Sequence, residues 1–374
     1  MTSNSILFQP FDLPNGAQLS NRLAIAPMTT FSSHSNGTVS DQEIAYYKRR
    51  AGLAGLFISA CIAISPTGLA FDHQFIAYDP AAILPRLKKM AEAMKSEGSK
   101  AVLQIQHGGS EVGKNLVLFN ETVSASRVPS FSNPDVVPRA LTDEEIKTII
   151  KEFGFATKIA IEAGFDGVEI HGANHYLIQQ FVSAHFNQRN DEWGGSLEKR
   201  LRFPFAVLEE VQRVAAKEGT SDFIIGYRFS PEEIHRFHGY DIEDTLQLVD
   251  GLISRGVHYL HVSQNDIQSV PHGSEEQGET IVHKLAAHID GRVPLIAVGG
   301  IHLPDQATAA IDDGADLVAL GREAIIDPDW TQKVKEDQLD QIQVKLDPSR
   351  QDALVVPDRL WKIITQPTGW FPLA

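Results

Sequence analysis

Three polar side chains that suit carbonyl chemistry fall within one short segment, HGANHYL at residues 171–177. The segment directly follows an apolar run, 167–170, which predicts a buried strand; in a parallel barrel, such a strand end is where chemistry takes place. His171 and Asn174 can both donate hydrogen bonds to one carbonyl oxygen, and Tyr176 can release a proton nearby. Because no nucleophile accompanies them, the set favours reduction of an activated alkene over hydrolysis. The alternative is a loop whose polar groups only cap the next helix.

A second group of residues indicates a bound phosphate. Gly299 and Gly300 end one predicted strand, and Gly321 with Arg322 ends the next. Glycines let a backbone approach an anion closely, and an arginine beside a helix N-terminus supplies a positive field. In parallel barrels, the loops after the seventh and eighth strands are the common phosphate site. The alternative is that these glycines only terminate their strands, but the coincidence of the two signals favours phosphate binding.

Polar residues also follow or end three other predicted strands. Pro27-Met28-Thr29 follows the first strand, Gln104 lies in the third, and Arg228 ends the fifth. A hydroxyl, an amide and a guanidinium beside a phosphate site suit a planar heterocycle rich in carbonyls and ring nitrogens, such as flavin mononucleotide (FMN). Two structural alternatives stay open. Gln104 could plug the barrel interior, and Arg228 could form an ion pair with Glu169 or another carboxylate of the barrel.

The elements that must hold these residues are short apolar runs that alternate with amphipathic helical patterns. Eight runs are continuously apolar, as strands buried on both faces should be: 23–27, 55–60, 101–106, 167–170, 223–228, 257–262, 295–298 and 317–320. Helical patterns lie between them, at 41–52, 80–97, 142–163, 197–217, 241–255, 280–289 and 304–313. The alternation predicts an α/β protein with a (β/α)8 TIM barrel. A doubly wound open sheet is the alternative, weakened because no glycine-rich dinucleotide turn follows the first strand.

Both ends of the chain are expected to add to the barrel. Within residues 6–19, the sequence Leu-Pro-Asn-Gly predicts an N-terminal β-hairpin that plugs the amino end of the barrel. After residue 331 the chain is charged and then apolar, and we expect this C-terminal extension, with Trp361, Trp370 and Phe371, to pack on the barrel or on a neighbouring copy. No linker divides residues 1–374, so we expect a single domain.

Composition limits the classes of partner. The formal net charge of −15 at pH 7 disfavours binding to nucleic acid or to an anionic membrane. Cys61 is the one cysteine, so neither an internal disulfide nor a multi-thiolate cluster can form; the histidines show no metal-ligand spacing, and we expect no metal. The N-terminus does not resemble a signal peptide, and no apolar stretch is long enough to cross a membrane. We therefore expect a cytoplasmic protein.

In their order along the chain, these residues resemble the old yellow enzyme family, the FMN-dependent ene-reductases also called NADH:flavin oxidoreductases. The resemblance extends from Asn21-Arg22 to Ile326. Its motifs are Asn21-Arg22 with Ala26-Pro27-Met28, then HGANHYL, then the block NQRNDEWGGSLEKR at 187–200. One branch of the family adds a four-cysteine iron–sulfur site and a second domain, for which this chain has neither the cysteines nor the length.

The resemblance implies that two sets of residues hold FMN. The ring contacts would be Pro27, Met28, Thr29, the backbone of Ala60 or Cys61, and, at the pyrimidine edge, Gln104 and Arg228. The phosphate contacts would be Gly299, Gly300, Gly321 and Arg322.

The resemblance also implies a mechanism. Hydride would pass from NADH or NADPH to the flavin, and then from flavin N5 to the β-carbon of an α,β-unsaturated carbonyl compound. His171 and Asn174 would grip the carbonyl oxygen, and Tyr176 would protonate the α-carbon. The expected partners are small enone-type molecules, together with a second copy of the chain if the apolar tail forms a homo-oligomer. Two alternatives remain: a flavin-free sugar-phosphate isomerase or aldolase with Glu169 as its base, and a flavoprotein redox sensor or store without alkene turnover.

Overall fold

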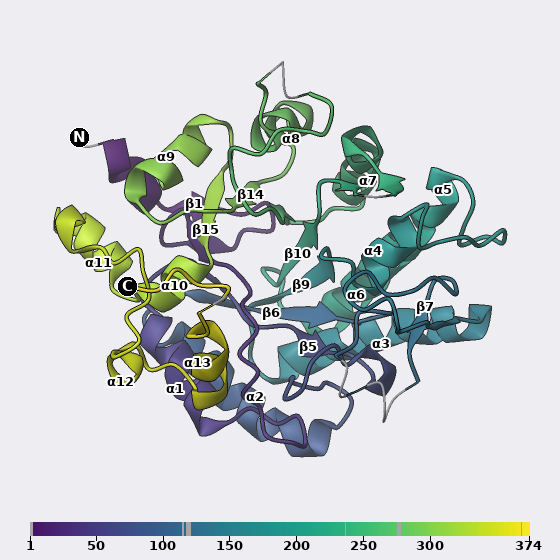
Figure 1. The fold of residues 1–374 in the computed structure, drawn as a ribbon, viewed down its shortest axis with the longest axis horizontal. Coiled ribbons are helices and arrows are strands. Elements are labelled where there is room, and N and C mark those ends of the chain that lie inside the picture. The colour runs from purple at the N-terminus through teal and green to yellow at the C-terminus, as the bar shows by residue number, and fades with distance from the viewer. Residues whose placement is uncertain (1–2, 114–115, 117–120, 236, 275–277, 368) are drawn as a thin grey trace.

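A closed barrel of eight parallel strands organises the chain (Figure 1). The computed structural model describes residues 3–113, 116, 121–235, 237–274, 278–367 and 369–374. Within them, the barrel strands are β3 (Leu23–Ile25), β4 (Leu56–Ile58), β6 (Lys100–Gln106), β9 (Gly167–Gly172), β10 (Ile224–Phe229), β13 (Tyr259–Val262), β14 (Leu295–Val298) and β15 (Leu317–Leu320). Their order is β4-β3-β15-β14-β13-β10-β9-β6, and pairing of β4 with β6 closes the ring. The predicted barrel is confirmed, and the open-sheet alternative is wrong.

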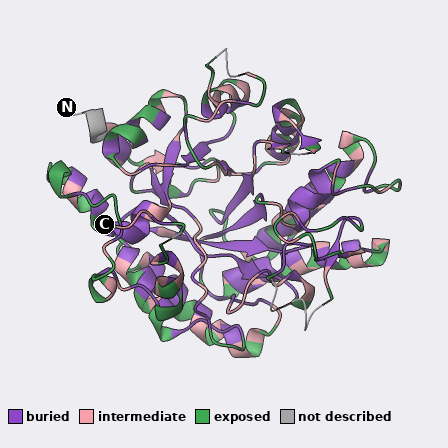
Figure 2. Ribbon diagram, viewed as in Figure 1, coloured by how far each residue is buried: buried purple, intermediate pink, exposed green. Residues whose placement is uncertain are grey.

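The strands were predictable because the barrel buries both of their faces. Figure 2 shows the central strands as buried and the outward sides of the surrounding helices as exposed. Of the residues in these eight strands, Lys100 alone is not buried. A strand covered by helices outside and by side chains inside needs apolar residues on both faces, so it appears as a continuous apolar run.

Helices follow the strands and form the outer layer. They are α1 (Asp41–Arg50), α2 (Pro80–Lys95), α3 (Asp143–Glu162), α4 (Leu177–Val182), α5 (Leu197–Arg200), α6 (Arg202–Glu218), α7 (Ile242–Ser254), α8 (Ile281–Ile289), α9 (Pro304–Asp312), α10 (Arg322–Ile326), α11 (Trp330–Lys335), α12 (Gln351–Leu354) and α13 (Asp358–Ile364). Short 3-10 helices are η1 (Ser3–Phe8), η2 (Pro66–Gly68) and η3 (Leu339–Gln341). Minor strands are β1 (Phe11–Asp12), β2 (Gln18–Leu19), β5 (Ile62–Ala63), β7 (Val123–Ser124), β8 (Arg139–Ala140), β11 (Glu233–Ile234) and β12 (His238–Tyr240).

One predicted helix, 197–217, is divided in the structure into α5 and α6 at Leu201. The cause is local. Pro204 has no N–H to bond with the carbonyl of Arg200 four residues earlier, so a continuous helix would lose a hydrogen bond there. The side chain of Arg200 also leaves the helix to donate to the carbonyls of Val182 and Gly195, at 2.7 and 2.8 Å.

The N-terminal hairpin closes the amino end of the barrel, as predicted. Strands β1 and β2 pair antiparallel, and Gly16 adopts a left-handed φ of +87° in the turn between them. Leu13 and Leu19 join a buried cluster with the inward-facing barrel residues Leu56 and Leu317. The hairpin thus shields the apolar side chains at the amino end of the barrel from water.

The C-terminal extension packs on the barrel of its own chain. Figure 1 shows α12 and α13, in yellow, beside α1. The buried guanidinium of Arg50 in α1 donates to the carbonyl of Leu354, and Gln42 bonds the carboxylate of Asp358 at 2.9 Å. Among the described residues, no helix combines the length and apolarity that crossing a membrane would require.

The N-cap of α3 offers a test of the helix assignment. The hydroxyl of Thr142 accepts a hydrogen bond from the backbone N–H of Glu145. The carboxylate of Glu145 in turn accepts one from the backbone N–H of Thr142. We expect Thr142→Ala to lower the free energy of unfolding by about 1 kcal/mol. Thr148→Ala, in the middle of the same helix, should leave it almost unchanged. Urea unfolding of both variants checks this, and equal effects would contradict the capping role.

Candidate active site

A cavity of about 430 Å³ opens at the carboxyl ends of the barrel strands. Almost all of the residues that the sequence analysis assigned to the site line it, the exception being Ala60, the alternative to Cys61: Pro27, Met28, Thr29, Cys61, Gln104, His171, Asn174, Tyr176, Arg228, Gly299, Gly300, Gly321 and Arg322. These residues follow or end seven different segments of the chain, and barrel closure brings them together. A cavity of this size suits a small molecule or cofactor.

The end of β9 and the turn after it form one wall. His171 is the penultimate residue of β9, inside the strand and not beyond it as predicted. Asn174 and His175 then adopt left-handed backbone conformations, with φ of +58° and +62°. Tyr176 is the N-cap of α4, but its side chain makes no cap hydrogen bond. The interpretation of this segment as a helix cap is therefore wrong for Tyr176, whose phenol lines the cavity.

His171 is a neutral donor in this environment. Its side chain is 4% exposed, and its Nδ1 is buried without a hydrogen-bond partner among the described residues. Burial lowers the pKa of His171 well below its ordinary value of 6.5, and the nearby positive charge of Arg228 lowers it further. The imidazole therefore carries one N–H and no charge at neutral pH.

Tyr176 lies between aromatic rings. It meets His171 edge to face, with ring centroids 5.1 Å apart, and Phe71 at 6.2 Å. Burial raises the pKa of Tyr176 well above its ordinary value of 10.0, and the neighbouring groups Cys61 and Glu111 raise it further. The phenol stays protonated at neutral pH, so it is a proton source only for a strongly basic acceptor.

A buried carboxylate sits inside the barrel next to the cavity. Glu169 accepts from Gln104 Nε2 at 2.7 Å, from the Tyr259 hydroxyl at 3.1 Å and from His261 Nδ1 at 2.9 Å. Burial by itself raises the pKa of Glu169, but His261, Arg228 and Gln104 together bring it below the ordinary value. The carboxylate is therefore ionised, and Gln104 both lines the cavity and joins this interior network.

Arg228 does not form the ion pair with Glu169 that the sequence left open. Its Nη2 donates instead to the hydroxyl of Ser263 at 3.0 Å, and its Nε is buried with no partner among the described residues. The charge of Glu169 still opposes the burial that lowers the pKa of Arg228. A guanidinium that lines the cavity and keeps an unused donor is suited to a polar ligand there.

The two glycines after β14 have structural reasons of their own. Gly299 has φ of +139°, and a Cβ there would lie 2.7 Å from the backbone nitrogen of Asp266. Gly300 has φ of +64°, which side chains disfavour. After β15, which pairs with β14, Arg322 begins α10 and its Nη1 bonds the carbonyl of Trp370 at 3.4 Å. The close packing of the loop after β13 on Gly299 was not visible in the sequence.

Cys61 lines the cavity as a buried thiol. It lies between β4 and β5 and is 5% exposed. Burial raises its pKa to about 12, so it is not a thiolate at neutral pH. Gln74 Nε2 bonds its carbonyl oxygen at 3.3 Å. The absence of a thiolate agrees with a site that does not work by nucleophilic attack.

The sequence analysis assigned no role to several cavity residues: Phe71, Ser263, Gln264, Asn265, His302 and Trp370. Ser263 to Asn265 directly follow β13, and the rule that sites lie at carboxyl strand ends could have found them. His302 follows Gly300-Ile301, and its Nδ1 lies 2.8 Å from the buried carboxylate of Glu323. Phe71 and Trp370 lie in irregular segments, where no spacing pattern in the sequence marks a site residue.

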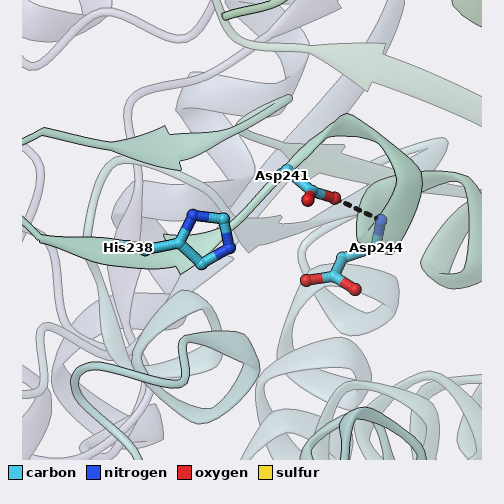
Figure 3. Close-up of side chains that lie close together, drawn as sticks. All are labelled: His238, Asp241 and Asp244. Atoms are coloured by element: carbon cyan, nitrogen blue, oxygen red, sulfur yellow. Dashed lines mark hydrogen bonds between the residues drawn. The ribbon is translucent and has the colours of Figure 1, made fainter.

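A separate polar cluster lies away from the cavity, where α7 begins. The potential ligand atoms of His238, Asp241 and Asp244 lie within 4.8 Å of one another (Figure 3). The carboxylate of Asp241 accepts from the backbone N–H of Asp244 at 3.0 Å and so caps α7. Capping accounts for the position of Asp241 without a metal. The absence of a metal from this chain stays a prediction.

Comparison with known proteins identifies the family to which the sequence is similar. Residues 6–341 match the sequence profile of the NADH:flavin oxidoreductase / NADH oxidase family. The chain is 45% identical to a probable NADH-dependent flavin oxidoreductase of Bacillus subtilis, over 98% of this chain and 97% of that protein. It is 42% identical to NADH:fumarate oxidoreductase of Klebsiella pneumoniae, over 97% of this chain but only 39% of that longer protein. A solved structure of morphinone reductase in complex with tetrahydroNAD is 30% identical, with a TM-score of 0.74, over 88% of this chain and 90% of that one.

The protonation state of His171 can be measured directly. Because its pKa is lowered, its neutral form should persist as the pH falls through the ordinary value of 6.5. In 15N-histidine NMR, we expect the signal that is missing from His171→Ala to keep the shifts of a neutral imidazole throughout. A titration midpoint near 6.5 for that signal would contradict the buried, neutral assignment.

Proposed function

We propose, from the premise that this chain belongs to the NADH:flavin oxidoreductase / NADH oxidase family, that it reduces the activated double bond of a small α,β-unsaturated carbonyl compound. The chain is an oxidoreductase of a family whose flavin is FMN and whose reductant is NADH. The observation that carries the proposal is one cavity wall with two neutral hydrogen-bond donors, His171 and Asn174, and a protonated phenol, Tyr176.

The residues around the cavity fit FMN. The partnerless Nε of Arg228 is a donor for the carbonyl and nitrogen edge of a flavin ring, beside the amide of Gln104. Arg322 lies after β15, three strands from β10 around the barrel, where its charge suits the phosphate at the other end of the molecule. Gly300 leaves backbone groups near Arg322 without a covering side chain. Pro27, Met28 and Thr29 would contact the ring from the end of β3.

When bound, FMN takes two electrons from the reduced nicotinamide and passes them to the acceptor. His171 and Asn174 would orient the acceptor by donating hydrogen bonds to its carbonyl oxygen. Negative charge develops on this oxygen as the double bond is reduced, so fixed donors stabilise the transition state more than the ground state. A preorganised donor of this kind is worth about 3 kcal/mol. Because His171 is neutral, it can donate without transferring its proton.

Tyr176 would supply the proton that completes the saturated product. Its raised pKa makes it a weak acid, which suits the strongly basic carbon formed next to the carbonyl group and protects against proton loss in the resting site. Contacts with Phe71 and His171 hold the ring in place. Glu169, the base that a sugar-phosphate isomerase would need, is completely buried and fully bonded, which counts against that alternative.

One observation favours a second candidate function. The chain corresponds to only 39% of NADH:fumarate oxidoreductase, so the fumarate-reducing part of that protein can lie outside the matched region. In that case this chain would oxidise NADH and pass the electrons to an acceptor other than a small alkene. The donors His171 and Asn174 would then serve the nicotinamide carboxamide alone.

An anaerobic spectrum distinguishes the two. We expect the purified yellow protein to bleach when NADH is added and to recover its flavin absorbance when an enone or an unsaturated acid such as acrylate follows. Recovery with air but not with either alkene would support the second candidate. A colourless protein that does not take up FMN would contradict both.

The role of Tyr176 can be tested by measuring reduction and reoxidation of the flavin separately. We expect Tyr176→Phe to slow reoxidation of the flavin by an enone by about 10²- to 10⁴-fold, because a general acid is lost. Reduction of the flavin by NADH needs no such proton and should change little. Stopped-flow absorbance measures both rates, and Tyr78→Phe, partly buried outside this cavity, is the matched control. Equal losses in both half-reactions would count against Tyr176 as the proton donor.

A further inference from the structure

Three side chains at neighbouring strand ends form a continuous hydrogen-bonded chain across the cavity wall. Arg228 Nη2 donates to Ser263 Oγ at 3.0 Å, and Ser263 Oγ donates to Asn174 Oδ1 at 3.0 Å. Arg228 lies in β10, which pairs with β9 on one side and β13 on the other. Asn174 follows β9, and Ser263 follows β13. The serine therefore reaches past the middle strand to the substrate wall.

Chemistry fixes the direction of the bond between Arg228 and Ser263. A guanidinium can only donate, so Ser263 Oγ must accept from Arg228, and the hydroxyl hydrogen is left to donate elsewhere. Its acceptor is the amide oxygen of Asn174. With Oδ1 turned to Ser263, the Nδ2 end of the amide is left for a ligand in the cavity. We propose that Ser263 is a positioning residue that holds the Asn174 amide in the orientation in which it donates to the ligand.

Among the described residues, the Ser263 hydroxyl is the one partner that orients the Asn174 side-chain amide. The backbone of Asn174 is fixed, because its N–H donates to Ser230 Oγ at 3.0 Å and its φ is +58°. The terminal torsion of an asparagine is broad, however, and the oxygen and nitrogen ends of the amide have almost the same shape. Without the serine hydroxyl, the amide can turn its oxygen lone pairs toward the ligand oxygen, which replaces attraction with repulsion.

The relay also connects the two halves of the site. Arg228 keeps a partnerless Nε for the flavin edge while its Nη2 polarises the Ser263 hydroxyl, and a polarised hydroxyl is a stronger donor to the amide. The positive charge of Arg228 thus acts on the substrate wall through Ser263. This inference rests on the proposed function, since the orientation matters because Asn174 donates to a ligand oxygen.

The test compares two variants that differ in one group. Both variants add a methyl group to the serine side chain; Ser263→Thr keeps the hydroxyl, and Ser263→Val replaces it with a second methyl group of similar size. Ser263→Val is a more decisive test than Ser263→Ala, because the space left by alanine can admit a water that bridges Arg228 and Asn174. The readout is the dissociation constant of phenol, which presents one oxygen to the same donors, from the visible flavin spectrum of the oxidised holoenzyme. We expect about tenfold weaker binding for Val and binding within about twofold of wild type for Thr.

A double-mutant cycle with Asn174→Ala separates orientation from other effects. If Ser263 acts through the amide, Ser263→Val should have almost no effect on phenol binding once Asn174 is alanine. A tenfold loss in both backgrounds would overturn the proposal, as would unchanged binding in Ser263→Val alone. Ser263→Ala, which removes atoms and adds none, is measured in parallel if threonine or valine reduces FMN content or thermal stability.

The cycle is independent of turnover, so its failure can be told from failure of the proposed function. An additive cycle in a protein that reduces enones would overturn the relay alone. A non-additive cycle in a protein that reduces no alkene would support the relay and contradict the proposed function.

Discussion

The ionised carboxylate of Glu169, completely buried inside the barrel, is the constraint on which the polar end of the structure depends. A bare charge cannot be kept in such a place, and Glu169 is compensated by three hydrogen bonds and by the nearby charge of Arg228. In return it fixes the amide of Gln104 and favours a positive charge on the neighbouring strand. Removing one partner of such a buried set typically costs about 3–5 kcal/mol. The network therefore specifies one arrangement of the cavity floor.

The turn after β9 is strained and is held by groups from other parts of the chain. Left-handed backbone costs a residue other than glycine about 1–2 kcal/mol, and Asn174 and His175 both adopt it. Ser230 accepts the N–H of Asn174, and the buried Glu233 pairs with His175 Nδ1 at 3.1 Å. Phe131 stacks on the His175 ring with centroids 3.9 Å apart. These contacts compensate for the strain and hold Asn174 and Tyr176 in fixed positions on the cavity wall.

Much of the fold follows from local sequence. The eight strands are continuous apolar runs because both of their faces are covered. Thr142 and Glu145 form a capping-box pattern that marks the start of α3. The short helices α4, α10 and α12 were not predicted, since four to six residues contain too little periodicity and too few capping signals to stand out. The division between α5 and α6 depends on Pro204 together with the tertiary contacts of Arg200.

The sequence by itself determined which side chains are available at each strand end, because order along the chain and the period of a strand are local properties. It therefore determined that His171, Asn174 and Tyr176 share one rim with Gln104, Arg228 and the glycines after β14. Only the tertiary structure decided the partners: Arg228 bonds Ser263 and not Glu169, Gly299 makes room for the backbone of Asp266, and Trp370 returns from the C-terminal segment to the cavity. Hydrogen bonds and close packing between residues far apart in sequence depend on where barrel closure brings the strands. That geometry is a property of the closed barrel as a whole, and no single segment of the sequence determines it.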